Sequence, residues 1–228
     1  MRKRHQIGLS MLELLIVLGV GMVLVAMVAP LVNTTINMYR LRGVTGEYAN
    51  LLQRARIRAV TDDRYYPVYA ATKPYAGSVN AFADFNNGNG VAAGTYAVKP
   101  TADPAVSFNS AVSVKSQASA PNINNLYTRF MPGIALTAVQ INPNTWAAAG
   151  STVVTFGARG LPCYLAAAPA PGSTCSYTWP GVTPQPIAFE VFMQNTRTNA
   201  WEAVTVNPSG RVREWRYNTS SQTWQPLD

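Results

Sequence analysis

A long apolar stretch, residues 9–32, lies near the start of the chain, and Glu13 is the only charged residue in it. The 19 residues of 14–32 are uncharged and, at about 1.5 Å each in a helix, would cover about the 30 Å of a bilayer core. Three cations at positions 2–4 precede the stretch, which predicts that its start lies in the cytoplasm and that the following chain is exported. Because no Ala-x-Ala cleavage site follows in a suitable position, the stretch is expected to remain as a membrane anchor.

The helical pattern continues beyond the apolar stretch, which predicts one helix from about Leu9 to Thr61 with a length of about 80 Å. Its end is indicated by Asp62, Asp63 and Pro67. An apolar stripe with spacings of three or four residues runs along its second half: Met38, Leu41, Val44, Tyr48, Leu51, Leu52, Ala55 and Ala59. Five arginines fall mostly on the other faces and are expected to face solvent: Arg40, Arg42, Arg54, Arg56 and Arg58.

The middle of the chain, residues 64–150, is predicted to be a loop-rich variable region. It is rich in Ala, Asn, Gly, Ser and Pro, with short β-prone pieces at 65–70 and 94–98. Residues 101–144 carry few charges and are expected to form an inserted, loop-rich decoration.

Residues 151–228 are predicted to form an antiparallel sheet. The expected strands are 153–156, 187–193, 201–206 and 211–217, and the second places Ile187, Phe189, Val191 and Met193 on one face. Turns are expected at 195–199 and at Asn207-Pro208-Ser209-Gly210. A long helix packed on an antiparallel sheet makes the fold class α+β.

The composition argues against most kinds of catalytic site. Of 228 residues only 12% are charged, the net charge is +8, and His5 is the single histidine. A zinc site, a histidine-based catalytic triad and a histidine acid–base pair are therefore nearly excluded, and we expect no enzymatic activity, cofactor or metal. Segment 84–90, Asp-Phe-Asn-Asn-Gly-Asn-Gly, resembles a calcium loop in its alternating oxygens, but it has one carboxylate and no closing glutamate. A hairpin or Asx turn is favoured there.

Cys163 and Cys175 are the only two cysteines, and they enclose eleven residues. An isolated pair in an exported domain predicts a disulfide rather than a metal site.

The basic segment Gly-Arg-Val-Arg-Glu-Trp-Arg at 210–216 is the strongest candidate for binding chemistry outside the membrane. On a strand, Arg211, Arg213 and Trp215 would share one face, with the two guanidinium groups about 7 Å apart, a spacing that suits successive backbone phosphates. Trp215 would then offer a surface for base stacking or for packing. Periodicity alone favours the simpler interpretation, in which these arginines keep an exposed strand soluble.

Glu13 is unusual for a membrane helix. It could lie at the headgroup level, neutral or solvated, or it could await a cationic partner within the membrane. The surrounding residues, Gly-Leu-Ser-Met-Leu-Glu-Leu-Leu-Ile-Val at 8–17, resemble the processing site of type IV pilins and type II secretion pseudopilins. Leu9 stands where phenylalanine is usual in that family, and Pro30 falls where many pilins carry a proline.

The resemblance implies a residue-by-residue organisation. A prepilin peptidase would cut between Gly8 and Leu9 and methylate the new amino terminus, so that 1–8 is a leader and 9–32 a transmembrane and assembly helix. Glu13 would pair with the amino terminus of a neighbouring subunit during filament assembly. Residues 33–63 would form the amphipathic helix of a pilin-like head.

A second resemblance is narrower. Residues 49–58, 152–160 and 204–213 are similar to the FimT and pseudopilin H group of minor pilins, and 82–86 is similar to the Phe-x-Asp-x-Asn hairpin of that group. In FimT proteins a Gly-Arg-x-Arg motif is implicated in DNA binding, which implies this role for Arg211 and Arg213. Arg216 is expected to add a contact, and Arg159 and Arg197 would do so if the fold brings them near.

The expected function is that of a minor type IV pilin that takes part in pilus assembly and binds extracellular DNA non-specifically for uptake. The alternative is a structural minor pseudopilin of a type II secretion system without a DNA-binding role. A membrane-anchored enzyme has little support in the sequence. The implied partners are other major and minor pilins or pseudopilins, prepilin peptidase, the inner membrane and DNA. The chain would span the inner membrane once with its head in the periplasm, and it would be extracellular when assembled into a pilus.

Overall fold

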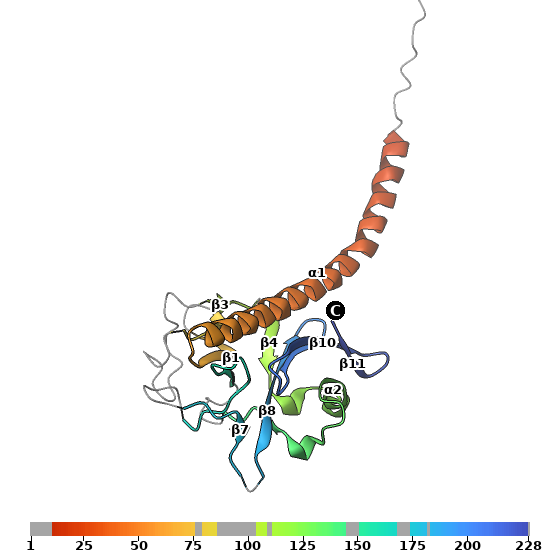
Figure 1. Cartoon of the computed structure of the whole chain (residues 1–228). Coiled ribbons are helices and arrows are strands. Elements are labelled where there is room, and N and C mark those ends of the chain that lie inside the picture. The colour runs from red at the N-terminus through yellow and green to blue at the C-terminus, as the bar shows by residue number, and fades with distance from the viewer. Residues whose placement is uncertain are drawn as a thin grey trace, which may run out of the picture.

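The computed structural model describes residues 11–75, 79–85, 104–108, 111–144, 151–167, 174–181 and 183–227. Within these ranges one long helix, α1 (Met11–Thr61), precedes a head of mostly antiparallel β-strands (Figure 1). The expected α+β class is therefore confirmed.

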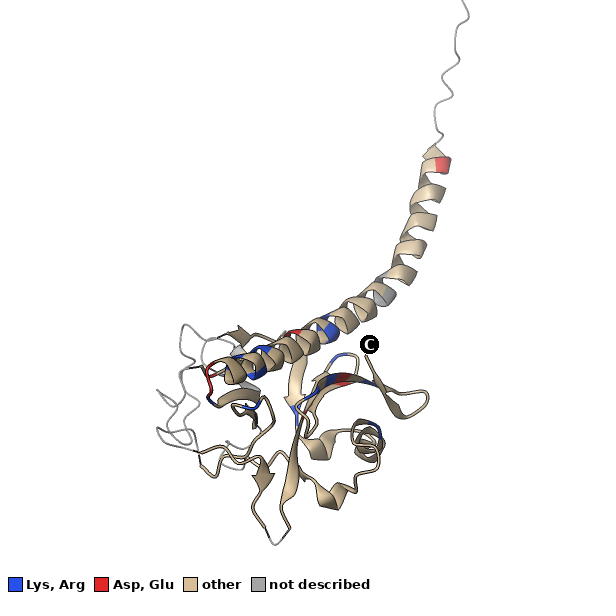
Figure 2. Cartoon of the chain, in the orientation of Figure 1, with Lys and Arg blue, Asp and Glu red and all other residues tan. Residues whose placement is uncertain are grey.

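Helix α1 has 51 residues, which corresponds to about 77 Å. Its first half is apolar and exposed, and the helix is long and apolar enough to span a membrane. Figure 2 shows that its charged residues gather in the half packed on the head, apart from an acidic residue near its start. The helix ends where predicted: Asp63 has a left-handed backbone (φ 52°), and the Arg64 amide bonds back to the Ala59 carbonyl.

The second half of α1 packs on the head through the predicted stripe. All members but one are buried: Leu41, Val44, Tyr48, Leu51, Leu52, Ala55 and Ala59. The exception is Met38, which is 47% exposed and lies beside the turn after strand β8 (Gln185–Asn195), where the contact between helix and head begins. Met38 is thus the one member of the predicted stripe that the head does not bury, although Asn37 beside it is buried and its carbonyl accepts from the Asn195 side chain at 2.9 Å.

Two of the five arginines of α1 do more than face solvent. Arg56 is half-buried, and its Nε donates to the Gly160 carbonyl at 3.0 Å. Arg58 is exposed, but it pairs with Asp62 at 3.1 Å and its guanidinium lies 4.3 Å from the ring centroid of Phe85. The remaining three, Arg40, Arg42 and Arg54, are exposed as expected.

The head contains two sheets. The larger has the order β11 (Thr223–Pro226), β10 (Val212–Asn218), β9 (Ala200–Val206), β8 and β4 (Val112–Lys115), with β5 (Gln140–Ile141) and β7 (Thr178–Trp179) also pairing with β8. The smaller has the order β3 (Ala105–Val106), β2 (Val79–Ala83), β1 (Tyr66–Tyr75) and β6 (Ser151–Phe156). The predicted strands in 151–228 are all found, but they do not form a single sheet as expected, because β6 pairs with β1 in the smaller sheet. The predicted strand at 65–70 corresponds to β1. The β-prone piece 94–98 lies outside the described residues.

Strand β8 is buried on both faces. Ile187, Phe189, Val191 and Met193 face the core under α1, as predicted, whereas Ala188 and Phe192 belong to a second core on the opposite side. That second core is covered by the segment expected to be a loop-rich decoration. Its described part forms β3, β4, β5, two short 3₁₀ segments (Gln117–Ser119 and Leu136–Ala138) and helix α2 (Ile123–Phe130), so this expectation is corrected.

Helix α2 is held on the sheet by an apolar face and by one buried polar contact. Leu126, Tyr127 and Phe130 are buried, and the Tyr127 hydroxyl donates to Glu190 Oε1 at 2.9 Å. The Gln117 amide donates to the same hydroxyl. Glu190 is only 1% exposed, and burial raises its pKa to about 7, although the hydrogen bond from Tyr127 opposes this shift. Burial and the nearby Glu190 raise the pKa of Tyr127.

The raised pKa of Glu190 predicts that the head is less stable at neutral than at mildly acidic pH. The folded chain holds this proton more tightly than the unfolded chain, in which the pKa is near its ordinary value of 4.5. The stabilisation is fully present below that value and is lost as the pH rises through 7, a loss of at most about 3 kcal/mol.

In Glu190→Gln, which stays neutral and can still accept from Tyr127, the free energy of unfolding should depend less on pH. Denaturant unfolding between about pH 5 and about pH 8, followed by tryptophan fluorescence, measures the difference. Parallel pH profiles would contradict it.

Candidate functional site

The predicted turn at 207–210 positions the start of the basic strand. The Gly210 amide donates to the Asn207 carbonyl at 2.8 Å, and the Asn207 amide donates to the Arg211 carbonyl at 3.1 Å. The Asn207 side-chain oxygen accepts from the Arg211 amide at 2.9 Å and from the Ser209 hydroxyl at 2.7 Å. Asn207 thus closes the turn and fixes the backbone of Arg211.

Gly210 is required by a close backbone approach. Its φ is 78°, and a Cβ at this position would lie 2.3 Å from the Gly160 carbonyl oxygen. The same oxygen accepts the hydrogen bond from Arg56. Helix α1 therefore meets two glycine turns at one point: the turn that ends at Gly160 and the turn that ends at Gly210. The glycine of the Gly-Arg-x-Arg segment therefore has a structural reason that is independent of any ligand.

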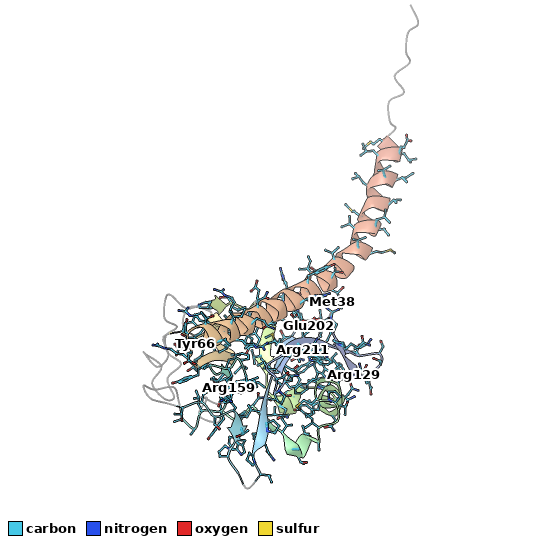
Figure 3. The ribbon with its side chains drawn as sticks, in the orientation of Figure 1. Met38, Tyr66, Arg129, Arg159, Glu202 and Arg211 are labelled. Carbon is cyan, nitrogen blue, oxygen red and sulfur yellow. A yellow bond between two sulfur atoms is a disulfide. The ribbon has the colours of Figure 1, made fainter. Side chains whose placement is uncertain are left out.

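Arg211 and Arg213 lie beside a third arginine that the sequence did not indicate. Arg211 is exposed and Arg213 half-buried, and with exposed Arg129 from the last turn of α2 they line a groove of about 260 Å³. Its other lining residues are Phe130, Pro132, Thr205 and Asn207. None of the described residues that line the groove is acidic. Figure 3 labels Arg129 on α2 and Arg211 at the neighbouring strand. We call this site the arginine groove.

The two strand arginines also border a second groove, of about 340 Å³, between α1 and β10. The wall formed by α1 includes Asn50 and Gln53, and Glu214 lies on the strand side. Burial and the nearby carboxylate of Glu202 raise the pKa of Glu214. Because it contains a carboxylate, this second groove is a poorer site for an anion than the arginine groove.

Trp215 does not provide the expected stacking surface. It is 1% exposed, packs in the core under α2, and donates from Nε1 to the Thr205 hydroxyl at 2.8 Å. Trp215 shares a face of the strand with Arg213, as alternation predicts. Helix α2 covers this face at Trp215 but leaves it open at Arg213, near the start of β10.

Arg216 lies away from the arginine groove. Its Nε and Nη2 donate to Glu202 Oε1 at 3.2 and 3.0 Å, and these residues are opposite one another in the β9–β10 register. Glu202 is buried, so this contact partly neutralises Arg216. Of the three arginines expected to bind DNA, the structure brings Arg211 and Arg213 together and separates Arg216 from them.

The two further arginines considered as DNA contacts do not line the arginine groove. Arg159 precedes Gly160, which packs against Gly210, and its guanidinium lies 5.1 Å from the ring centroid of Tyr177. Arg197 is in the turn between β8 and β9. That turn is at the opposite end of β9 from Arg211, which is a distance of about 20 Å along the strand.

The remaining predicted sites have different outcomes. The disulfide between Cys163 and Cys175 is confirmed, with Cα atoms 5.6 Å apart and Cys163 buried against Tyr65 and Leu165. Glu13 lies exposed in the first described turn of α1. The processing residues Gly8 and Leu9 lie outside the described residues. Of the candidate calcium loop, 84–90, residues 86–90 also lie outside them, and Asp84 is buried. The described residues contain no cluster of side chains that could hold a metal ion.

Comparison of the chain with protein-family models, with curated proteins and with solved structures gave no match.

The contact between the two glycine turns predicts that Gly210→Ala destabilises the head. A left-handed alanine costs about 1–2 kcal/mol, and the approach of the Gly160 carbonyl adds to this cost. Gly43→Ala is the control: nothing lies within 4 Å of a Cβ at this helical position, and alanine there should stabilise the chain by about 1 kcal/mol. Denaturant unfolding of the full chain in a neutral detergent compares the two variants. Equal unfolding midpoints would contradict the packing described here.

Proposed function

We propose that this chain is a minor subunit of a type IV pilin-like filament, anchored in the inner membrane with its head in the periplasm, and that its head binds DNA. The observation that carries the assignment is α1 itself. One continuous helix exposes a membrane-length apolar half and packs its other half on a mostly antiparallel head. A helix of this kind can leave the bilayer and pack against copies of itself without rearrangement of the head.

Glu13 is the assembly residue in this proposal. A carboxylate at the centre of a membrane helix costs about 2.5–3.5 kcal/mol, and less near the interface. Pairing with the amino terminus that cleavage between Gly8 and Leu9 creates on a neighbouring subunit would offset this cost. Because an isolated chain would bear the cost of an unpaired Glu13 carboxylate and an assembled chain would not, this residue would favour the filament over isolated chains.

The assembly role predicts two results in cells that contain the peptidase. The mature chain should begin at Leu9, as measured by intact mass and amino-terminal sequencing. Glu13→Gln should still be inserted and cut, but its amount in sheared filaments should fall at least tenfold because the ionic partner is lost, whereas the exposed Glu47→Gln on the same helix should assemble normally. A mature chain that retains its first eight residues would contradict the proposal.

The arginine groove is the proposed DNA site. Arg211 directly precedes β10 and Arg213 is its second residue. Alternate positions of extended chain are about 7 Å apart, which suits successive phosphates, and Arg129 adds a third cation from across the groove. Because Trp215 is buried, the binding would use backbone phosphates rather than stacked bases. It would therefore be independent of base sequence and sensitive to salt.

DNA binding is tested with the full chain in a neutral detergent by gel shift at low salt. Arg211→Gln/Arg213→Gln should lose DNA retention, and Arg129→Gln should weaken it. For the variants that still bind, the slope of log K against log salt should become shallower by about 0.9 for each phosphate that the protein no longer neutralises. Arg197→Gln removes one positive charge, as Arg129→Gln does, but at the far end of β9, and it should bind as the wild type does. If the double variant binds DNA as well as Arg197→Gln does, the DNA-binding part of the proposal is wrong.

A structural minor pseudopilin without a DNA-binding role is the second candidate. It is favoured by the burial of Trp215 and by the ion pair of Arg216, since both remove chemistry expected at a DNA-binding ridge. Normal filament assembly together with unchanged DNA retention in the double variant would favour this candidate.

A further inference from the structure

A third groove lies where the exposed half of α1 meets the head. Its volume is about 320 Å³. One wall is α1 from Thr34 to Leu41, and the other is formed by the β8–β9 turn and the end of β10. Met38, Trp201 and Tyr217 give it an apolar side, and exposed Arg197 lies at the turn. Figure 3 places Met38 and Glu202 at the end of the head from which the exposed half of α1 emerges. We call this site the juxtamembrane groove.

The position of the groove along α1 places it at the membrane surface. The apolar stretch ends at Val32, so Thr34 is about 3 Å and Met38 about 9 Å further along the helix. The polar layer on each side of a bilayer core is about 5–8 Å thick. With the exposed half of α1 in the bilayer, Thr34 lies within the headgroup layer and Met38 at its outer edge.

The charges of the groove favour an anion. Two cations, Arg197 and Arg216, and one carboxylate, Glu202, are among its described lining residues. Since Arg216 pairs with Glu202, the charge of Arg197 remains to face the groove. Tryptophan and tyrosine side chains are enriched at membrane interfaces, and Trp201 and Tyr217 would be at this level.

We propose that the juxtamembrane groove binds an anionic phospholipid, with Arg197 on the headgroup phosphate and Met38 and Trp201 against the glycerol and upper acyl chain. The proposal rests on the membrane-spanning part of the proposed function and does not need the DNA-binding part. A bound lipid would fix the rotation of the head about α1 relative to the membrane. It would also give a single-helix anchor a second attachment point.

The test uses the full chain in nanodiscs that contain phosphatidylglycerol and phosphatidylcholine in equal amounts. After extraction with a mild neutral detergent, native mass spectrometry counts the lipids that remain bound. The wild type should retain phosphatidylglycerol in preference to phosphatidylcholine. Arg197→Gln should reduce this retention at least fivefold, and Arg197→Lys should restore most of it because the charge is retained. Met38→Gln should reduce retention of the lipid without a change of charge.

Arg129→Gln is the matched control, because it removes an exposed arginine from the other end of the head. Inorganic phosphate, added as a competitor, should not displace the lipid. Equal retention of both lipids by the wild type, equal loss of phosphatidylglycerol in Arg197→Gln and Arg129→Gln, or displacement by phosphate would overturn the proposal. Failure of the chain to enter nanodiscs would instead refute the membrane anchor, so the two failures are distinguishable. Circular dichroism and tryptophan fluorescence verify that each variant is folded.

Discussion

The burial of one apolar stripe of α1 against both sheets is the interaction on which the head depends. Tyr48 and Leu52 are completely buried in this contact, and strands of the larger and the smaller sheet both touch the helix. Because the helix is continuous, it fixes the position of the strand ends along its axis. Arg56 extends from it to the glycine turns at the far end, and Met38 lies beside the β8–β9 turn at the near end. The arginine groove and the juxtamembrane groove are therefore held apart by the same contact that forms the core.

The elements that follow from local periodicity were predictable. The helix up to Thr61, the turn at 207–210 and the strands around it are set by the spacing of apolar residues and by Gly, Pro and Asn at turns. The disulfide followed from a simple count of cysteines. The alternation in β8 correctly placed four apolar side chains on the face that packs under α1, but it did not indicate that the opposite face is also buried. The other face is covered by α2, which is only eight residues long and whose signal is four apolar or aromatic residues among polar ones.

The candidate site was only partly predictable because its parts come from distant segments. Alternation placed Arg211 and Arg213 on one face, and the structure keeps them together. Alternation could not show that α2 covers Trp215 or that it brings Arg129 to the same groove, since Arg129 is far from both in the sequence. The ion pair of Arg216 depends on the register between β9 and β10, which decides that Glu202 is its neighbour.

Strand β8 has a consequence for how the head opens. It contributes side chains to both cores and pairs with β4, β5, β7 and β9, so it is the element common to most of the head (Figure 1). Local openings of a native protein release the least buried segments first. The backbone amides of β8 cannot exchange with solvent until both layers have separated from it. This strand should therefore report the global unfolding of the head, while the edge strands β3 and β11 report only local fraying.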